Sequence, residues 1–204
     1  MNGYLKMLES KCKGFYFFDS EIMASVIGLG YNEDGRPDFS DIHNKLLYYF
    51  PNIRPIIEKG LIFLFELQNT RWILGRLCLI TGTLSFYTKI KSEDVNVLND
   101  VARKLYGSIN FIVYMKDGDS MVPCKSIEFI DDNAEVADID SGVYALHIAK
   151  SLALHSNIRS LSKERVEILR QTLLLEMRGN MLISTNGKQF LLKDCEFLMI
   201  DSLF

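Results

Sequence analysis

Residues 140–146 read Asp140-Ser141-Gly142-Val143-Tyr144-Ala145-Leu146, a short polar start that runs directly into apolar side chains. An acidic stretch, residues 131–140 (DDNAEVADID), comes immediately before them. Serine is a residue type that starts helices well, and apolar side chains follow from Val143 onwards. The sequence therefore predicts a helix from about Ser141 to His155 that begins directly after an acidic loop.

Three β-strands are predicted upstream of this helix. Residues 61–67 are nearly all apolar, which is typical of a strand that is buried on both faces. Residues 72–80 form the second predicted strand and residues 84–87 the third, with Thr81-Gly82 as the turn between them.

Between the strands and the Ser141 helix, an amphipathic helix is predicted over residues 92–106, because apolar side chains recur there at helical spacing. Gly107 is the expected end of that helix. A fourth strand is predicted over residues 109–115 and a fifth over residues 126–130.

Further elements are predicted at both ends of the chain. They are a helix from Asp19 or Ser20 to Leu29, a turn-rich loop over 30–38, a helix from Ser40 or Asp41 to Phe50, a helix from Ser162 to Arg178 ended by Gly179, and a hairpin around Asn186-Gly187. Helices and strands in this order favour an α+β fold. We expect residues 1–14 to be an N-terminal extension, 15–178 the domain, and 179–204 a β-ribbon that packs on the domain or on a partner.

The segment 140–146 resembles the Asp-Cys-Gly-Val-Phe motif of the SUMO and ubiquitin-like-protein proteases, the family that includes the adenovirus endopeptidase. In that family the cysteine is the nucleophile at a helix N-terminus, where the helix dipole and a neighbouring imidazolium stabilise its thiolate. Residues 61–74 resemble the family's apolar strand, Asn, His-Trp and next apolar strand, and residues 82–88 resemble its following strand. The resemblance covers roughly residues 15–178. It implies a papain-like fold with a central mixed sheet flanked by helices.

Every catalytic position of that family carries a different residue in this chain. The resemblance places the family's His on Arg71, its orienting Asp or Asn on Thr88, its oxyanion-hole Gln on Glu135 and its Cys on Ser141. An arginine stays protonated near neutral pH and cannot act as a general base, and a threonine has no charge to stabilise an imidazolium. A glutamate would repel an oxyanion, and a serine nucleophile needs the base that is missing. We also expect a salt bridge between Arg71 and Glu135 that closes the site.

The resemblance also implies binding positions, which are Asn69, Trp72, Asp140 and Gly142. In the family the tryptophan helps to cover a narrow channel for a modifier's Gly-Gly tail, and the glycine lets substrate backbone approach closely. Trp72 either keeps that role or packs in the core as the chain's one tryptophan.

The remaining reactive side chains favour no second catalytic centre. Ser141 itself is expected to act as the helix N-cap, and His147 is expected to point away from it. The four cysteines form no CxxC pair, and together with the three histidines they show no spacing typical of a zinc site. These residues are Cys12, Cys78, Cys124, Cys195, His43, His147 and His155. We therefore expect no metal or cofactor and reduced thiols in an intracellular compartment, cytoplasmic or nuclear.

The composition narrows the classes of partner. The net charge is −3 and the 23 Lys and Arg residues are scattered, so we expect no nucleic-acid partner. No apolar run approaches the roughly 20 residues that span a bilayer, and no export signal is evident. The acidic stretch 131–140 is either a solvated connector or a surface for a basic partner.

These observations leave three functions open. The first is a pseudoprotease that binds SUMO, ubiquitin or another protein as a scaffold or regulator. The second is an active deconjugating protease with a non-standard constellation at Ser141 or Cys124. The third is a subunit of a complex in which a partner covers the surface around Trp72 and Gly142, which in the resembled family binds the substrate.

Overall fold

In the computed structural model of this chain, the described residues are 1–12, 14–39, 48, 60–67, 71–88, 91–117, 124–130, 137–155, 162–183, 189–193 and 196–200. The helices are α1 (Asn2–Lys11), α2 (Ser20–Ile27), α5 (Asp94–Asp117), α6 (Ser141–Ala153) and α7 (Lys163–Gly179), with a short 3-10 turn η1 (Asp138–Asp140). The strands are β1 (Tyr16–Phe18), β2 (Leu61–Leu67), β3 (Arg71–Cys78), β4 (Thr83–Tyr87), β5 (Ser126–Ile130), β6 (Leu182–Ile183), β7 (Gln189–Lys193) and β8 (Glu196–Ile200). The helix predicted to end near Phe50 falls outside the described residues, Tyr48 apart.

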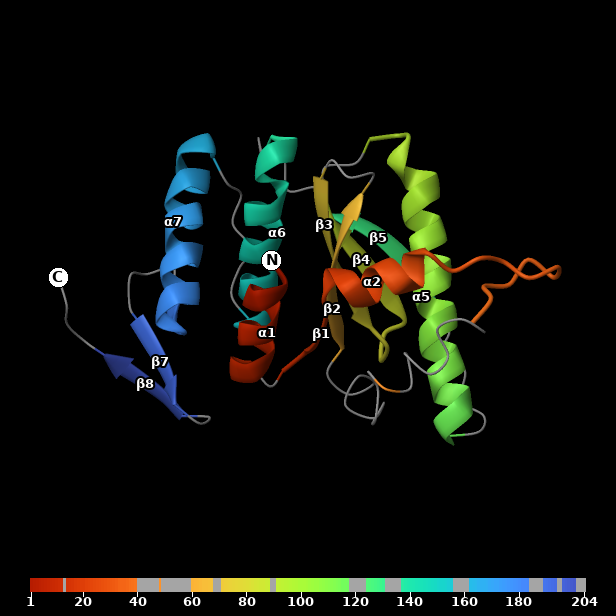
Figure 1. The fold of residues 1–204 in the computed structure, drawn as a ribbon, viewed down its shortest axis with the longest axis horizontal. Coiled ribbons are helices and arrows are strands. Elements are labelled where there is room, and N and C mark those ends of the chain that lie inside the picture. The colour runs from red at the N-terminus through yellow and green to blue at the C-terminus, as the bar shows by residue number, and fades with distance from the viewer. Residues whose placement is uncertain are drawn as a thin grey trace.

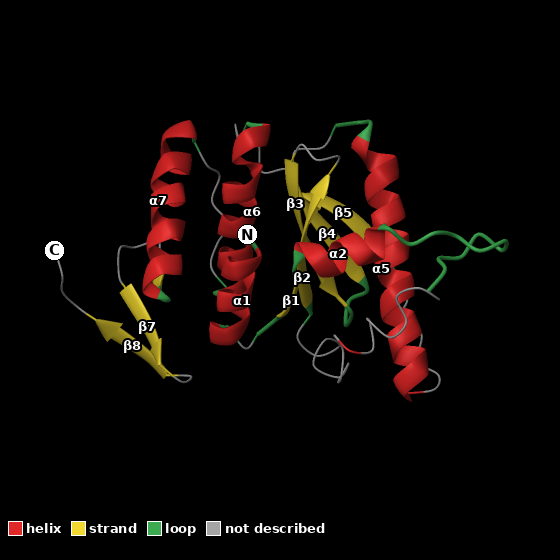
Figure 2. Ribbon diagram, in the orientation of Figure 1, coloured by secondary structure: helices red, strands yellow, loops and turns green. Residues whose placement is uncertain are grey.

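The central sheet has five strands in the order β1-β2-β3-β4-β5 and is mixed. The outer pairs β1–β2 and β4–β5 are parallel, and the inner pairs β2–β3 and β3–β4 are antiparallel. Helices cover both faces: α2 and α5 lie on one side, and α1 and α6 lie on the other with α7 outside them (Figure 1, Figure 2). The predicted α+β class, with a central mixed sheet flanked by helices, is confirmed.

The apolar strand β2 is buried on both faces, as its composition predicts. Phe63 and Phe65 lie in the core that the sheet shares with α2 and α5, whereas Ile62 and Leu64 lie in the core shared with α1, α6 and α7. None of these four side chains is more than 2% exposed. Because burying a side chain of this size contributes about 1.5–3 kcal/mol, this strand stabilises both layers.

The strand predicted over residues 109–115 is wrong, because α5 continues through it to Asp117. Gly107 does not end the helix, since a glycine inside a helix costs only about 1 kcal/mol and the apolar spacing continues beyond it. A Cβ at Gly107 would lie 3.0 Å from Phe39 Cζ, so the glycine instead allows the Phe39 segment to approach. The buried residues of this continuous face are Leu98, Val101, Ala102, Leu105, Ile109, Ile112 and Val113.

Other predictions differ from the structure mainly at element ends. The turn at Thr81-Gly82 is present, with Gly82 at φ 70°, and Asp19 caps α2 by accepting hydrogen bonds from two backbone N–H groups. The last helix ends one residue later than predicted, because Asn180 adopts the left-handed conformation that commonly terminates helices.

The N-terminal residues contain a helix that the sequence did not indicate. Tyr4, Leu5 and Leu8 of α1 are at most 1% exposed and belong to the core beside α6. The division of the chain at residues 14 and 178 stays a prediction.

The predicted C-terminal hairpin corresponds to β6 and β7, which pair antiparallel on either side of Asn186-Gly187, although the turn itself falls outside the described residues. β8 continues this sheet on the far side of β7. Leu182 is fully buried in the core, so the ribbon's first strand packs on the domain. Within the described part of the chain, no helix has the length and apolar character required to cross a bilayer.

Candidate functional site

Ser141 is the first residue of α6, and its hydroxyl group connects three elements. The hydroxyl oxygen accepts a hydrogen bond from the Trp72 backbone N–H at 2.9 Å, which links α6 to the start of β3. The hydroxyl also donates to the Asp138 carbonyl oxygen at 2.6 Å, which links it to η1. The prediction that Ser141 is the N-cap is wrong: Asp140 holds that position and makes no side-chain cap bond. The Ser141 hydroxyl is therefore committed as both donor and acceptor.

Arg71 opens β3 and is buried in an ion pair. Its guanidinium donates to the carboxylate of Asp94, in the first turn of α5, and the two side chains are 6% and 3% exposed. The Asp94 carboxylate also accepts the Lys91 backbone N–H at 2.9 Å. Glu135, the predicted partner of Arg71, lies outside the described residues, so that pair stays a prediction. The position expected for a general base thus holds a buried cation paired with an acid that the sequence reading missed.

Trp72 and Gly142 face each other, and the Met1 side chain also lies against Gly142. Trp72 is half-buried and packs against the core formed by α1, α6 and α7. A Cβ added to Gly142 would lie 3.2 Å from Trp72 Cδ1 and 3.1 Å from Met1 Sδ. The space above Gly142, where the resemblance places an approaching substrate backbone, is therefore filled by the Met1 side chain.

The other predicted positions lie around this centre or outside the described chain. Thr88 follows the end of β4, is 7% exposed, and donates its backbone N–H to the Ile130 carbonyl at 3.3 Å. Leu74 pairs with Tyr87 in the β3–β4 register, so Thr88 continues beside β3 near its start. Asp140 accepts a hydrogen bond from Arg170 of α7. Asn69 lies outside the described residues.

The structure thus brings Arg71, Trp72, Ser141 and Gly142 together at the start of β3 and of α6. It adds two residues that the sequence reading did not select. Asp94 could have been suspected as an acidic residue at a helix start. Met1 carries no sequence signal for its place, because its contact depends on how α1 packs.

The hydrogen bonds of the Ser141 hydroxyl, to Trp72 and Asp138, involve no histidine or cysteine of the described chain. His147 is buried on α6, six residues beyond Ser141, and the exposed His155 has its ring 5.7 Å from that of Phe15. Burial raises the pKa of the Cys12 thiol, which disfavours its thiolate. No group of three or more metal-ligating side chains occurs among the described residues.

Comparison with known proteins identifies the fold. No family model and no curated protein matches the chain. Among solved structures, the C-terminal Ulp1 protease domain in complex with Smt3, the yeast ortholog of SUMO, has a TM-score of 0.63 at 12% identity, covering 87% of this chain and 73% of that one. The SUMO protease Ulp1 with its catalytic cysteine oxidised to a sulfenic acid has a TM-score of 0.62 at 12% identity, covering 87% and 74%.

An identity of 12% shows a shared fold and nothing finer. This chain has the papain-like α+β fold of the ubiquitin-like-protease type, as residues 61–74 and 140–146 indicate. Within that fold its similarity is to the SUMO protease domain of Ulp1.

The Ser141 hydroxyl gives a direct test of the site's structural role. Replacing Ser141 by alanine removes the acceptor of the partly buried Trp72 N–H, and a donor left unsatisfied away from water costs about 1–3 kcal/mol. We expect the free energy of unfolding to fall by that amount in a denaturant titration followed by circular dichroism. Ser10→Ala is the control, because the Ser10 hydroxyl is exposed and bonds only within α1. Equal stability of the two variants would contradict the role assigned to Ser141.

Proposed function

We propose that this chain is a pseudoprotease: a protein-binding or scaffold module that keeps the ubiquitin-like-protease fold without its hydrolytic chemistry. The observation that carries the proposal is the hydrogen bonding of Ser141. Its hydroxyl accepts from Trp72 N–H and donates to the Asp138 carbonyl, so its proton is directed at a backbone acceptor and not at a base. A serine needs a base to become a nucleophile.

The Arg71–Asp94 pair supports the same proposal. Arginine stays protonated and has no lone pair with which to accept a proton from Ser141. The buried Asp94 carboxylate in turn accepts hydrogen bonds from the Arg71 guanidinium and from the Lys91 backbone N–H. The groups that surround the serine therefore hold the start of β3 against α5 and α6.

The proposed partner is a protein, with a SUMO-like or ubiquitin-like modifier as the first candidate, in the nucleus or cytoplasm. The Ulp1 domain of similar fold is in complex with Smt3. A modifier tail entering between Trp72 and Gly142 would have to displace Met1. We therefore expect any modifier to bind this chain through its globular surface more than through its C-terminal tail.

Activity probes test the loss of chemistry. SUMO and ubiquitin with C-terminal electrophiles should form no covalent adduct with the chain, as read by intact-protein mass spectrometry. The Ser141→Cys variant should also remain unlabelled, because a thiol at that position still lacks a neighbouring base. An adduct on the unaltered chain that Ser141→Ala or Cys124→Ala abolishes would establish the alternative, an active deconjugating protease.

Modifier binding is tested separately through the chain's one tryptophan. Isotope-labelled protein gives one indole N–H signal, from Trp72, and unlabelled SUMO or ubiquitin is titrated against it. A saturable shift of that signal places the modifier at the old substrate face. If no signal of the protein shifts at high micromolar modifier, the modifier is not the partner and the subunit role is favoured. Affinity purification from the native source then identifies the partner.

A further inference from the structure

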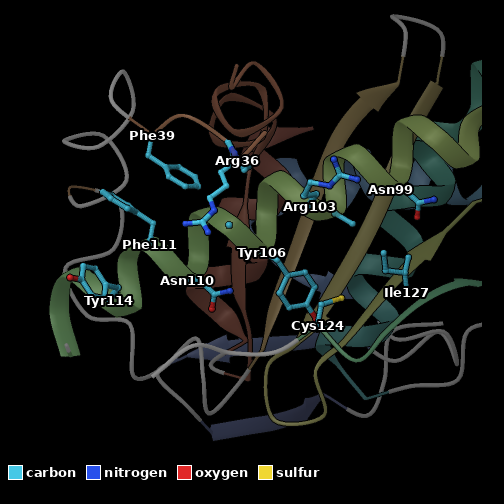
Figure 3. A pocket seen from close by; sticks show the side chains of 13 residues that line it. Arg36, Phe39, Asn99, Arg103, Tyr106, Asn110, Phe111, Tyr114, Cys124 and Ile127 are labelled. Carbon is cyan, nitrogen blue, oxygen red and sulfur yellow. The ribbon is translucent and has the colours of Figure 1, made fainter. Parts of the chain in front are cut away.

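A long groove lies along the outer side of α5, on the opposite face of the sheet from Ser141. It encloses about 950 Å³ and is bordered by α5, the segment 36–39 and the start of β5 (Figure 3). Its lining runs along α5 from Asn99 to Tyr114, which at 1.5 Å per residue corresponds to about 22 Å. A groove of that length suits an extended peptide of six or seven residues better than a compact small molecule.

One end of the groove is aromatic. Phe39 and Phe111 stack there with their ring centroids 5.0 Å apart, and both line the groove. Tyr114 borders the same end and is 63% exposed, and the neighbouring Met115 is 46% exposed. Figure 3 shows Phe39, Phe111 and Tyr114 grouped at this end. Large apolar side chains that gather on a concave surface mark a place for an apolar anchor.

The remainder of the groove is cationic and polar. Arg36 and Arg103 line it, and no aspartate or glutamate is among the described lining residues. Neither arginine forms a salt bridge with a described residue, although Arg103 interacts with the Tyr31 hydroxyl and with the charge of Asp100, whose carboxylate also pairs with Lys104 at 3.1 Å. The whole chain has a net charge of −3, so this local excess of positive charge is opposite to the overall balance. Arginine pairs well with carboxylates.

Tyr106 adds a weakly engaged hydrogen-bonding group. It is 6% exposed and lines the groove, and its hydroxyl lies beside the Cys124 thiol, which is a weak hydrogen-bonding partner. Burial and the adjacent Cys124 raise the pKa of Tyr106, so the group is a neutral donor at physiological pH. A buried hydroxyl normally has a strong hydrogen-bond partner. A hydroxyl that lacks one beside a groove can donate to an acceptor atom of a bound ligand.

We propose that this groove binds an extended acidic segment of a partner protein that carries an aromatic or aliphatic anchor residue. The anchor packs against the stacked rings of Phe39 and Phe111 beside Tyr114, the carboxylates pair with Arg36 and Arg103, and Tyr106 donates to the segment's backbone or carboxylate. The site is separate from the Ser141 centre and does not depend on modifier binding there.

The test uses the full chain and a fluorescein-labelled Asp-Glu-Phe-Leu-Asp-Glu peptide, followed by fluorescence anisotropy. We expect saturable binding that weakens at least tenfold in Arg36→Ala/Arg103→Ala and a few-fold in Tyr106→Phe. The matched control is Arg165→Ala/Arg178→Ala, which removes the same charge from exposed positions of α7 and should leave the affinity within twofold. A peptide with lysines in place of its acidic residues should not bind.

Cys124 supplies an independent readout because it is exposed and lines the groove. The acidic peptide should slow alkylation of Cys124, measured by peptide mapping, without slowing that of Cys78. Absence of binding at millimolar peptide, equal weakening in both double variants, or equal binding of the lysine peptide would each overturn the proposal. Displacement of the peptide by N-acetylphenylalanine at similar concentration would also overturn it, since the site would then suit a small amphipathic acid.

Discussion

Replacing Glu176 by alanine is expected to lower the free energy of unfolding by about 3–5 kcal/mol, because it leaves a buried lysine without its counter-charge. Glu176 is on α7 and is fully buried. One carboxylate oxygen accepts from Lys150 Nζ of α6 and from the Ile183 backbone N–H at 2.5 Å. The other accepts from the Tyr4 hydroxyl of α1 at 2.5 Å. A single side chain thus joins three helices and β6.

The size of the effect follows from what the variant leaves behind. The Lys150 side chain is only 8% exposed, and its remaining described acceptor is the Ile183 carbonyl. Burial and the Glu176 charge raise the pKa of Tyr4, so the tyrosine stays a neutral donor that would lose its acceptor. Removing one partner of a buried polar network costs more than removing the network as a whole.

Two further variants separate this explanation from a general sensitivity of α7. Glu167→Ala removes an exposed carboxylate of the same helix and should change stability by less than about 0.5 kcal/mol. Lys150→Met/Glu176→Leu removes both charges and should be less destabilised than Glu176→Ala, although Tyr4 and Ile183 still lose an acceptor. Urea titrations followed by circular dichroism give all three values. A double variant less stable than Glu176→Ala would contradict the network described here.

The sequence predicts this domain well where one physical signal dominates. The apolar run 61–67 predicts a strand that is buried on both faces of the sheet, and the polar-to-apolar change at 140–146 predicts the start of α6. The strand predicted over 109–115 is wrong because the helical apolar spacing of α5 continues past Gly107 to Val113. Glycine in a helix has a small cost that packing readily exceeds.

Buried polar residues were predicted less well than apolar ones. Glu176 lies at helical spacing from Val166, Leu169 and Leu173, so the pattern places it on the buried face of α7. The pattern cannot show that Lys150 and Tyr4 meet it there, because those residues come from helices that are far apart in the chain. The same holds for Asp94, whose partner Arg71 lies on a different element.

Replacing Asp94 by alanine is the second change for which we expect a loss of about 3–5 kcal/mol, because it removes the carboxylate that faces a buried guanidinium. Arg71 is 5% exposed at the start of β3, next to Trp72, whose N–H is held by Ser141. The loss of the Asp94 carboxylate also removes the acceptor of the Lys91 N–H at the start of α5. Glu93→Ala, one position earlier and exposed, removes the same charge and should be nearly neutral.

The decisive comparison is the double variant Arg71→Met/Asp94→Leu. Apolar residues of similar volume can replace a buried ion pair with little loss, so the double variant should recover most of the stability that Asp94→Ala loses. Such recovery would show that the pair is a structural element between β3 and α5, as a pseudoprotease requires. The opposite outcome would be that the Arg71→His variant is stable and the Arg71→Met/Asp94→Leu variant is not. If the activity probes then also labelled the protein that carries Arg71→His and Ser141→Cys together, the site would have retained catalytic geometry. The Arg71–Asp94 pair would then occupy the place of a catalytic dyad, which substitutions at both Arg71 and Ser141 restore.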